Sequence, residues 1–303
     1  MPLICKAAAS ILLRMVAITE IPLVPVSARQ VVVGEGIRLA LEERGEHGRP
    51  GAVFAHGFGQ TRHAWSGTSA RVAASGWHTL SYDSRGHGDS DRLPSGDYRV
   101  EQLVDDMRQV AAAAAAPPVI IGASMGGLVG IAMAGSDAAY CSALVLVDVT
   151  PRWEPAGVAR ILSFMRAYPD GFADIDEVAE VVARYLPHRS TRKSPERLRG
   201  LLTRSADGRL RWHWDPRMLG PIAEDAEHHQ ADLFAAARRI RVPTLLITGA
   251  ASDVVSEQTI SEFLELVPHA KHVEVPRATH MVAGDENTAF SRHVLEFLET
   301  QRC

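Results

Sequence analysis

The sequence is poor in cysteine. Its 303 residues include 3 cysteines, Cys5, Cys141 and Cys303. None of them lies at a C-x-x-C spacing or beside a histidine at the spacing typical of zinc ligands. We therefore expect three unpaired thiols, a reducing cytoplasmic compartment and no bound metal.

Long apolar runs are also missing. No stretch approaches the roughly 20 uninterrupted apolar residues that a membrane-spanning helix requires. The run from Ala7 to Leu13 follows Lys6 and is ended by Arg14, and no good small-residue cleavage site comes after it, so it is a poor match to a secretory signal. We expect residues 1–27 to form an N-terminal arm.

The chain has no surplus of positive charge. Lys and Arg number 32 and Asp and Glu number 36, for a formal charge of -4, so the basic surface that nucleic-acid binding needs is absent. With 46% hydrophobic and 22% charged residues, the composition excludes disordered, collagen-like and coiled-coil proteins. The length suits one large α/β domain with an insertion and leaves the oligomeric state open.

Short apolar runs alternate with helix-like segments along most of the chain. Residues 29–33 and 37–43 have the composition of a β-hairpin. Further apolar runs, several of them rich in Val, Ile and Leu, lie at 52–55, 78–82, 119–121, 143–147, 244–248 and 272–275. Between them lie helix-like segments near 62–75, 99–116, 125–135, 256–267 and 287–300. This alternation predicts a mostly parallel sheet with helices on both faces.

The segment from 151 to 233 breaks this alternation. It shows no convincing strand, and its pattern predicts several short helices. We interpret it as a helical cap over the carboxyl end of the sheet, where open α/β sheets bind ligands, and call it the cap segment. The core then comprises residues 28–150 and 234–303. Three tryptophans of the cap segment could either line an apolar substrate pocket or hold the cap together: Trp153, Trp212 and Trp214.

The strongest motif is Gly122-Ala123-Ser124-Met125-Gly126, which follows an apolar strand and opens an Ala- and Gly-rich helix. This G-x-S-x-G pattern is typical of a nucleophile on a strained turn between strand and helix. The two glycines leave room for the backbones to pass. The motif predicts that the Ser124 hydroxyl is exposed at the amino end of a helix.

A nucleophilic serine needs a base, and the base needs an orienting acid. His280 follows the strand at 272–275 and is the candidate base. Asp253 follows the strand at 244–248 and is the candidate acid, in the expected chain order of serine, acid and histidine. Asp148, after the strand at 143–147, is a rival acid in the same layer. We expect Asp253 to be the partner of His280.

Serine attack on a carbonyl also needs two N–H donors for the oxyanion. The backbone N–H of Met125, next to the nucleophile, is one candidate. The other is expected after the strand at 52–55, where the sequence is His56-Gly57-Phe58-Gly59-Gln60. The N–H of Phe58 is the candidate there.

Together these motifs resemble the α/β-hydrolase superfamily, and in particular its capped serine hydrolases, which include bacterial esterases and cofactor-free haloperoxidases. The resemblance covers residues 28 to 300 and includes the stretch Asp83-Ser84-Arg85-Gly86-His87-Gly88-Asp89-Ser90. It implies an eight-stranded, mostly parallel sheet flanked by helices, with the insertion as the family's cap. It also implies that His87 belongs to a structural loop and not to the catalytic residues.

Departures from other branches narrow the implied reaction. Epoxide hydrolases and dehalogenases of this fold carry an aspartate where this chain has Ser124. Carbon-carbon bond hydrolases usually have His-Gly-x-Gly-Pro-Gly where this chain has His56-Gly57-Phe58-Gly59-Gln60-Thr61. The resemblance therefore implies a carboxylesterase or lactonase that forms an acyl-enzyme on Ser124, acts on a small-molecule substrate and uses no cofactor. Perhydrolysis, carbon-carbon bond cleavage beside a ketone and a non-catalytic ligand-binding role are the alternatives.

Overall fold

The computed structural model describes residues 23–187, 194–220, 226–285 and 287–302. Cys5 and Cys303 lie outside these residues, as does most of the predicted arm at 1–27. Cys141 is a free, buried thiol, as predicted, and burial raises its pKa to about 12.

Eight strands form one sheet in the order β1-β2-β4-β3-β5-β6-β9-β10. The sheet opens with the predicted hairpin, β1 (Val26–Val32) and β2 (Arg38–Arg44), and β2 pairs antiparallel with β4. The neighbours from β4 to β10 all pair parallel. These strands are β3 (Gly51–Ala55), β4 (His78–Tyr82), β5 (Val119–Ala123), β6 (Ala143–Val147), β9 (Thr244–Gly249) and β10 (Lys271–Val275). The predicted fold class, a mostly parallel eight-stranded sheet with flanking helices, is confirmed.

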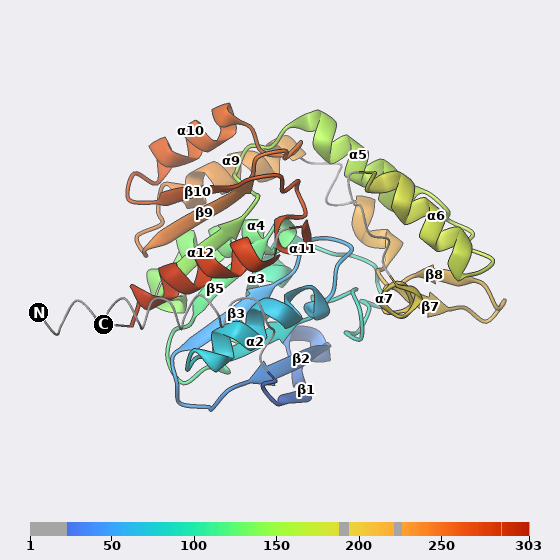
Figure 1. Cartoon of the computed structure of the whole chain (residues 1–303), viewed down its shortest axis with the longest axis horizontal. Coiled ribbons are helices and arrows are strands. Elements are labelled where there is room, and N and C mark those ends of the chain that lie inside the picture. The colour runs from blue at the N-terminus through green and yellow to red at the C-terminus, as the bar shows by residue number, and fades with distance from the viewer. Residues whose placement is uncertain (1–22, 188–193, 221–225, 286, 303) are drawn as a thin grey trace, which may run out of the picture.

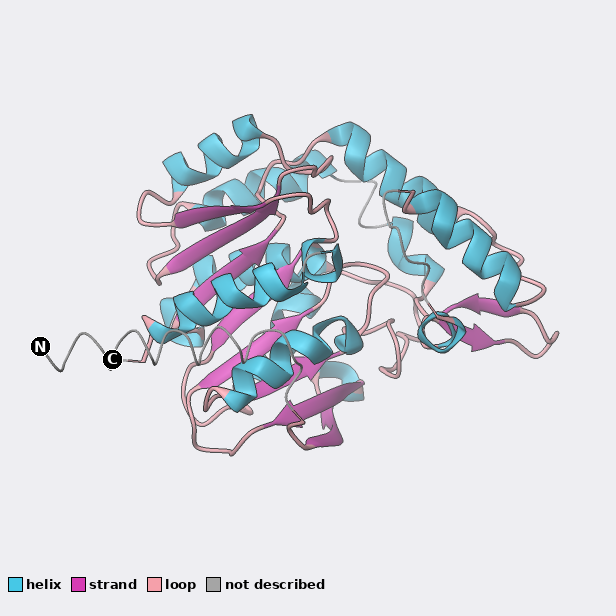
Figure 2. Ribbon diagram, in the orientation of Figure 1, coloured by secondary structure: helices cyan, strands magenta, loops and turns pink. Residues whose placement is uncertain are grey.

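Helices cover both faces of the sheet (Figures 1 and 2). On one face, α3 (Val100–Ala111), α4 (Met125–Ser136), α9 (Ala226–Ala237) and α10 (Glu257–Leu266) pack into one apolar cluster. On the other, α2 (Ser66–Ala74), α11 (Val282–Asp285) and α12 (Asn287–Glu299) pack into a second. The strands β3, β5 and β6 carry only glycine and apolar residues because both faces of the sheet are buried there.

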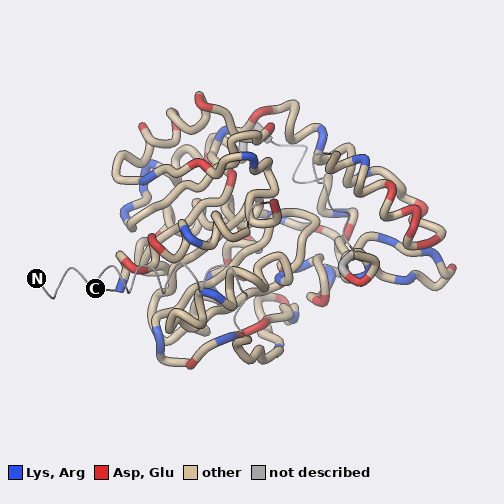
Figure 3. Tube along the Cα trace, viewed as in Figure 1, with Lys and Arg blue, Asp and Glu red and all other residues tan. Residues whose placement is uncertain are grey.

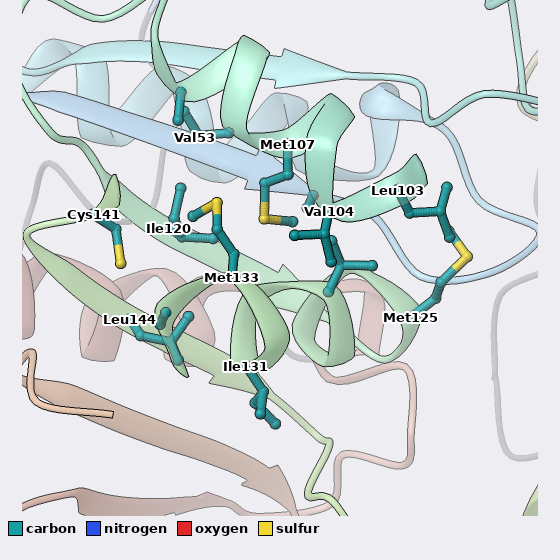
Figure 4. Packing of buried hydrophobic residues seen from close by; sticks show 14 of the residues in the cluster. Val53, Leu103, Val104, Met107, Ile120, Met125, Ile131, Met133, Cys141 and Leu144 are labelled. Carbon is teal, nitrogen blue, oxygen red and sulfur yellow. The ribbon is translucent and has the colours of Figure 1, made fainter. Parts of the chain in front are cut away.

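Figure 4 shows the packing of α3 and α4 against β5 and β6 in the first cluster. Ile120 and Leu144 on the strands face Met133 of α4. At the amino end of the same helix, the Met125 side chain points toward Leu103 of α3. This packing fixes the start of α4, where Ser124 lies.

The cap segment lies beside the sheet and contains α5 (Pro155–Arg166), α6 (Ile175–Tyr185) and α7 (Pro195–Arg199) (Figure 1). The expectation that it contains no strand is wrong, because β7 (Leu202–Arg204) and β8 (Leu210–Trp212) form an antiparallel pair. Asp207 and Gly208 lie between these strands, and the left-handed φ of +82° at Gly208 suits a turn there.

The predicted end of the cap segment at residue 233 falls inside α9. Leu233, Ala236 and Ala237 of this helix are buried in the first cluster with α4, so α9 packs as part of the core. Basic and acidic residues are interspersed along the chain (Figure 3). In the described part of the chain, no helix has both the length and the apolar character needed to cross a membrane.

Candidate active site

Ser124 occupies a strained turn between β5 and α4. Its backbone has φ +46° and ψ -118°, a conformation that costs on the order of 1–3 kcal/mol in a residue other than glycine. A Cβ atom on Gly122 would lie 2.4 Å from Gly126 O, and one on Gly126 would lie 2.4 Å from Ala55 O. Glycine is therefore required on both sides of Ser124, for the steric reason that the motif implies.

His280 and Asp148 form a hydrogen bond at the same edge of the sheet. His280 Nδ1 lies 2.8 Å from Asp148 Oδ2, and the Asp148 side chain is fully buried. Because a carboxylate only accepts hydrogen bonds, the ring proton of neutral His280 is on Nδ1. The lone pair of Nε2 is then free to accept a proton.

The Asp148 carboxylate is held by the last residue of β9 and by the loop that follows it. Its Oδ1 accepts the Gly249 N–H at 2.8 Å, and its Oδ2 accepts the Ser252 hydroxyl at 2.6 Å. Asp148 itself has a left-handed φ of +51° directly after β6. The N–H of Ser124 donates to Val147 O at 3.2 Å, which joins the turn of Ser124 to the residue before Asp148.

The structure does not place Asp253 against His280, in contrast to the sequence-based expectation. Asp253 Oδ2 accepts a hydrogen bond from Arg160 Nε of α5 at 2.6 Å, and its side chain is 40% exposed. Burial acts to raise the pKa of Asp253, but the hydrogen bond and the charge of Arg160, with smaller contributions that include the charge of His280, together lower it. Asp253 thus pairs with a cation of the cap segment, and the rival Asp148 is the residue that contacts the histidine.

The loop after β3, residues His56–Gln60, lies next to Ser124, and we call it the β3 loop. A Cβ atom on Gly57 would lie 3.2 Å from Ser124 Cβ. The N–H of Gly57 donates to the Gln60 side chain, that of Gly59 to His87, and that of Gln60 to Gly57 O. In the described ranges, the N–H groups of Phe58 and Met125 donate no hydrogen bond. Both predicted oxyanion donors are therefore available.

Three buried histidines fix the β3 loop: His56 lies within it, and His87 and His213 bond to Gly59 from outside. The part of His213 was not predicted from the sequence. His56, His87 and His213 each accept a backbone N–H at one ring nitrogen, from Ser84, Gly59 and Gly88 in turn. Each ring is therefore neutral, with its proton on the other nitrogen. Burial lowers the pKa of all three, and that of His213 falls to about 4.

The three candidate tryptophans lie in different surroundings. Trp212 and Trp214 are buried in the apolar cluster of the cap segment, where their rings stack with centroids 4.9 Å apart. Trp153 is partly buried against the first core cluster. Trp212 and Trp214 thus help to hold the cap segment together. Among the described residues, no three His, Cys, Asp or Glu side chains are grouped as metal ligands would be.

Comparison with known proteins gives a family match over most of the chain. The family described as alpha/beta hydrolase fold matches residues 53–286. A 3-hydroxybutyrate-oligomer hydrolase of Cupriavidus necator is 28% identical over 258 residues, which cover 80% of this chain and 87% of the relative. An esterase of Mycobacterium tuberculosis is 27% identical over 83% of this chain and 84% of its own length. These relatives are hydrolases.

A solved structure has the same fold. An enol-lactonase from Burkholderia xenovorans superposes with a TM-score of 0.68 at 25% identity, covering 89% of this chain and all of the lactonase.

Proposed function

Because the chain belongs to the alpha/beta-hydrolase family, as the match over residues 53–286 establishes, we propose that it is a serine hydrolase that cleaves a carboxylic ester or a lactone. The observation that carries the proposal is the hydrogen bond between His280 and buried Asp148, at the sheet edge where Ser124 occupies its strained turn. A serine, a histidine with a free Nε2 and a buried carboxylate are the groups that acyl transfer needs.

In the first half of the proposed reaction, Ser124 Oγ attacks the carbonyl carbon of the substrate. His280 Nε2 takes the hydroxyl proton, and Asp148 stabilises the imidazolium that forms. The N–H groups of Phe58 and Met125 donate to the oxyanion. When the carbon-oxygen bond breaks, His280 returns the proton to the departing alkoxide, which leaves as an alcohol and an acyl-enzyme remains.

In the second half, water attacks the acyl carbon. His280 removes a proton from the water, and the same two N–H groups hold the second oxyanion. The bond to Ser124 Oγ then breaks, the serine regains its proton from His280 and the carboxylic acid is released. A lactone follows the same steps, except that the alcohol and the acid belong to one product.

Asp148 takes the place that the sequence suggested for Asp253. Its carboxylate is buried and receives three hydrogen bonds, from Gly249, Ser252 and His280. Asp253 is 40% exposed and bonded to Arg160, and its hydrogen bond is therefore made to the cap segment and not to His280. We assign to Asp253 a role in attaching the cap segment.

The named activities of two relatives support an ester or a lactone as the substrate. An oligomer of 3-hydroxybutyrate is joined by ester bonds, and an enol-lactonase opens a cyclic ester. We propose that the cap segment shapes the site for the acyl or the alcohol part of such a substrate.

Steady-state hydrolysis of p-nitrophenyl esters from acetate to decanoate, on the wild type and Ser124→Ala, tests this function. We expect turnover by the wild type alone, because Ser124 supplies the nucleophile, and the chain length with the highest kcat/KM measures the acyl site. Equal turnover by the two proteins would overturn the mechanism. If neither protein hydrolyses these esters or a lactone series, carbon-carbon cleavage and ligand binding replace the proposal.

A further inference from the structure

His213 of the cap segment reaches the backbone of the β3 loop. Its Nδ1 accepts the Gly88 N–H at 2.8 Å, so the proton of its neutral ring is on Nε2. Nε2 lies 3.2 Å from Gly59 O and donates to it. One ring of the cap segment thus joins two loops of the core.

The β3 loop is also held on the side of the core. Gly59 N–H donates to His87 Nε2 at 3.2 Å, and His56 Nδ1 donates to Gly57 O at 2.8 Å. These bonds fix the peptide groups before and after Phe58. His213, from the cap segment, holds the next peptide group of the same loop, because Gly59 O lies between Gly59 and Gln60.

The chain around His213 is itself firmly attached to the core. Arg92 Nη2 donates to His213 O at 3.0 Å, and Asp215 N–H donates to Gly86 O at 2.8 Å. The cap segment also covers Gly59, because a Cβ atom there would lie 2.9 Å from Met165 Cε and 3.4 Å from the Trp214 ring. The position of His213 therefore follows the docking of the cap segment.

We propose that His213 is a positioning residue that holds the β3 loop in the conformation in which the Phe58 N–H serves as an oxyanion donor. Assembly of the oxyanion site then depends on the docked cap segment. This inference rests on the proposed function, because it assigns to His213 an effect on the transition state of that reaction. His213 itself contacts no reacting atom.

The surroundings of His213 keep its ring neutral. The ring centroid lies 5.9 Å from that of His87, and the side chain is buried and close to Arg92. Burial is the largest effect on its pKa, and His56 also lowers it, while the bond to Gly59 O and the charge of Asp83 act in the opposite direction. The pKa of His213 falls to about 4. The acceptor on Nδ1 and the donor on Nε2 therefore both persist near neutral pH.

Two substitutions at this position separate hydrogen bonding from packing. His213→Phe retains a ring beside Trp214 but loses both hydrogen bonds, whereas His213→Gln retains an acceptor and a donor. Loss of an oxyanion donor costs about 10²–10³-fold in kcat, so we expect a displaced donor in His213→Phe to cost at least about tenfold. We expect a change in KM of less than about threefold, and His213→Gln to recover most of kcat.

The matched control is His269→Ala. His269 is exposed and its Nε2 bonds to Val242 O just before β9, at the amino ends of the parallel strands and far from the β3 loop. We expect this variant to keep the wild-type kcat. A wild-type kcat in His213→Phe, or a change confined to KM, would overturn the inference.

Hydrogen exchange of the peptide that spans the β3 loop provides a readout independent of turnover. We expect faster exchange in His213→Phe than in the wild type and in His269→Ala, under conditions where all three proteins remain folded. Unchanged exchange would overturn the inference even if the protein proves to be an esterase. Faster exchange without any Ser124-dependent turnover would instead confirm the contact and reject the proposed function.

Discussion

The loops that follow β6 and β9 each carry an aspartate just beyond a buried strand, yet the two carboxylates lie in opposite environments. Asp148 is fully buried and bonded to His280, whereas Asp253 is 40% exposed and bonded to Arg160. The end of β9 and the loop after it still serve the site, because Gly249 and Ser252 hold Asp148. A carboxylate at the right end of a strand is therefore only a candidate, and its hydrogen-bond partners decide its role.

Exchange of each carboxylate for its amide should reveal the largest difference between the two aspartates. We expect Asp148→Asn to lower kcat/KM by about 10⁴-fold, the size of the same change in a serine-protease triad, since the amide disfavours the correct tautomer of His280. Asp253→Asn should lower it by less than about tenfold. Steady-state kinetics on a responsive ester measures both, and the reverse order would restore Asp253 as the orienting acid.

A smaller effect is expected from the serine that holds Asp148. Ser252→Ala removes a hydrogen bond of 2.6 Å to the carboxylate. Hydrogen bonds to charged groups contribute about 1.5–3 kcal/mol, so we expect a loss of roughly 10- to 100-fold in kcat/KM. The control is Ser142→Ala. Ser142 lies just before β6, at the amino ends of the parallel strands and therefore at the opposite end from Ser124. Equal kinetics for the two variants would show that the Ser252 hydroxyl contributes nothing to the role of Asp148.

The pH dependence of stability should differ between the buried histidines and the exposed Asp253. His56, His87 and His213 have pKa values below the usual 6.5 because they are buried. As the pH falls, these histidines are protonated in the unfolded chain before they are protonated in the folded protein. The free energy of unfolding should therefore fall as pH drops below about 6.5 and continue to fall toward pH 4. For His213 alone the loss at pH 5 is on the order of 2 kcal/mol.

Denaturant unfolding at pH 7, 6 and 5 measures this loss. The charges that face the three rings are Asp83, Arg62 and Arg92. We expect His213→Gln to show a shallower pH dependence than the wild type. The free energy of unfolding of Asp253→Asn should depend on pH as that of the wild type does, because the lowered pKa of Asp253 keeps it ionised throughout this range. Stability independent of pH between 7 and 5 would contradict neutral, buried histidines.

Local sequence patterns predicted most of the fold. The runs at 119–121, 143–147 and 244–248 are apolar because both faces of these strands are buried, and the structure places β5, β6 and β9 there. The hairpin of β7 and β8 was missed because its strands have only three residues each. Asp207-Gly208 between them was the available signal.

The parts of the site that lie within one short sequence motif could be predicted. The glycines around Ser124 and the N–H groups of Phe58 and Met125 follow from sequence motifs. The partner of His280 depends on contacts between distant segments, since Arg160 of the cap segment engages Asp253 across 93 residues. The contact of His213 with Gly59 spans 154 residues and has no local pattern.

In the proposed reaction, Ser124 is a nucleophile activated by His280 and Asp148. The most direct test of this assignment is intact-mass spectrometry after treatment with a serine-directed phosphonate, over a time course on the wild type, Ser124→Ala, Asp148→Asn and Asp253→Asn. We expect one adduct on the wild type and none on Ser124→Ala. The rate of labelling should be similar to the wild type in Asp253→Asn and much slower in Asp148→Asn. An adduct on Ser124→Ala, or slow labelling of Asp253→Asn with normal labelling of Asp148→Asn, would contradict this assignment.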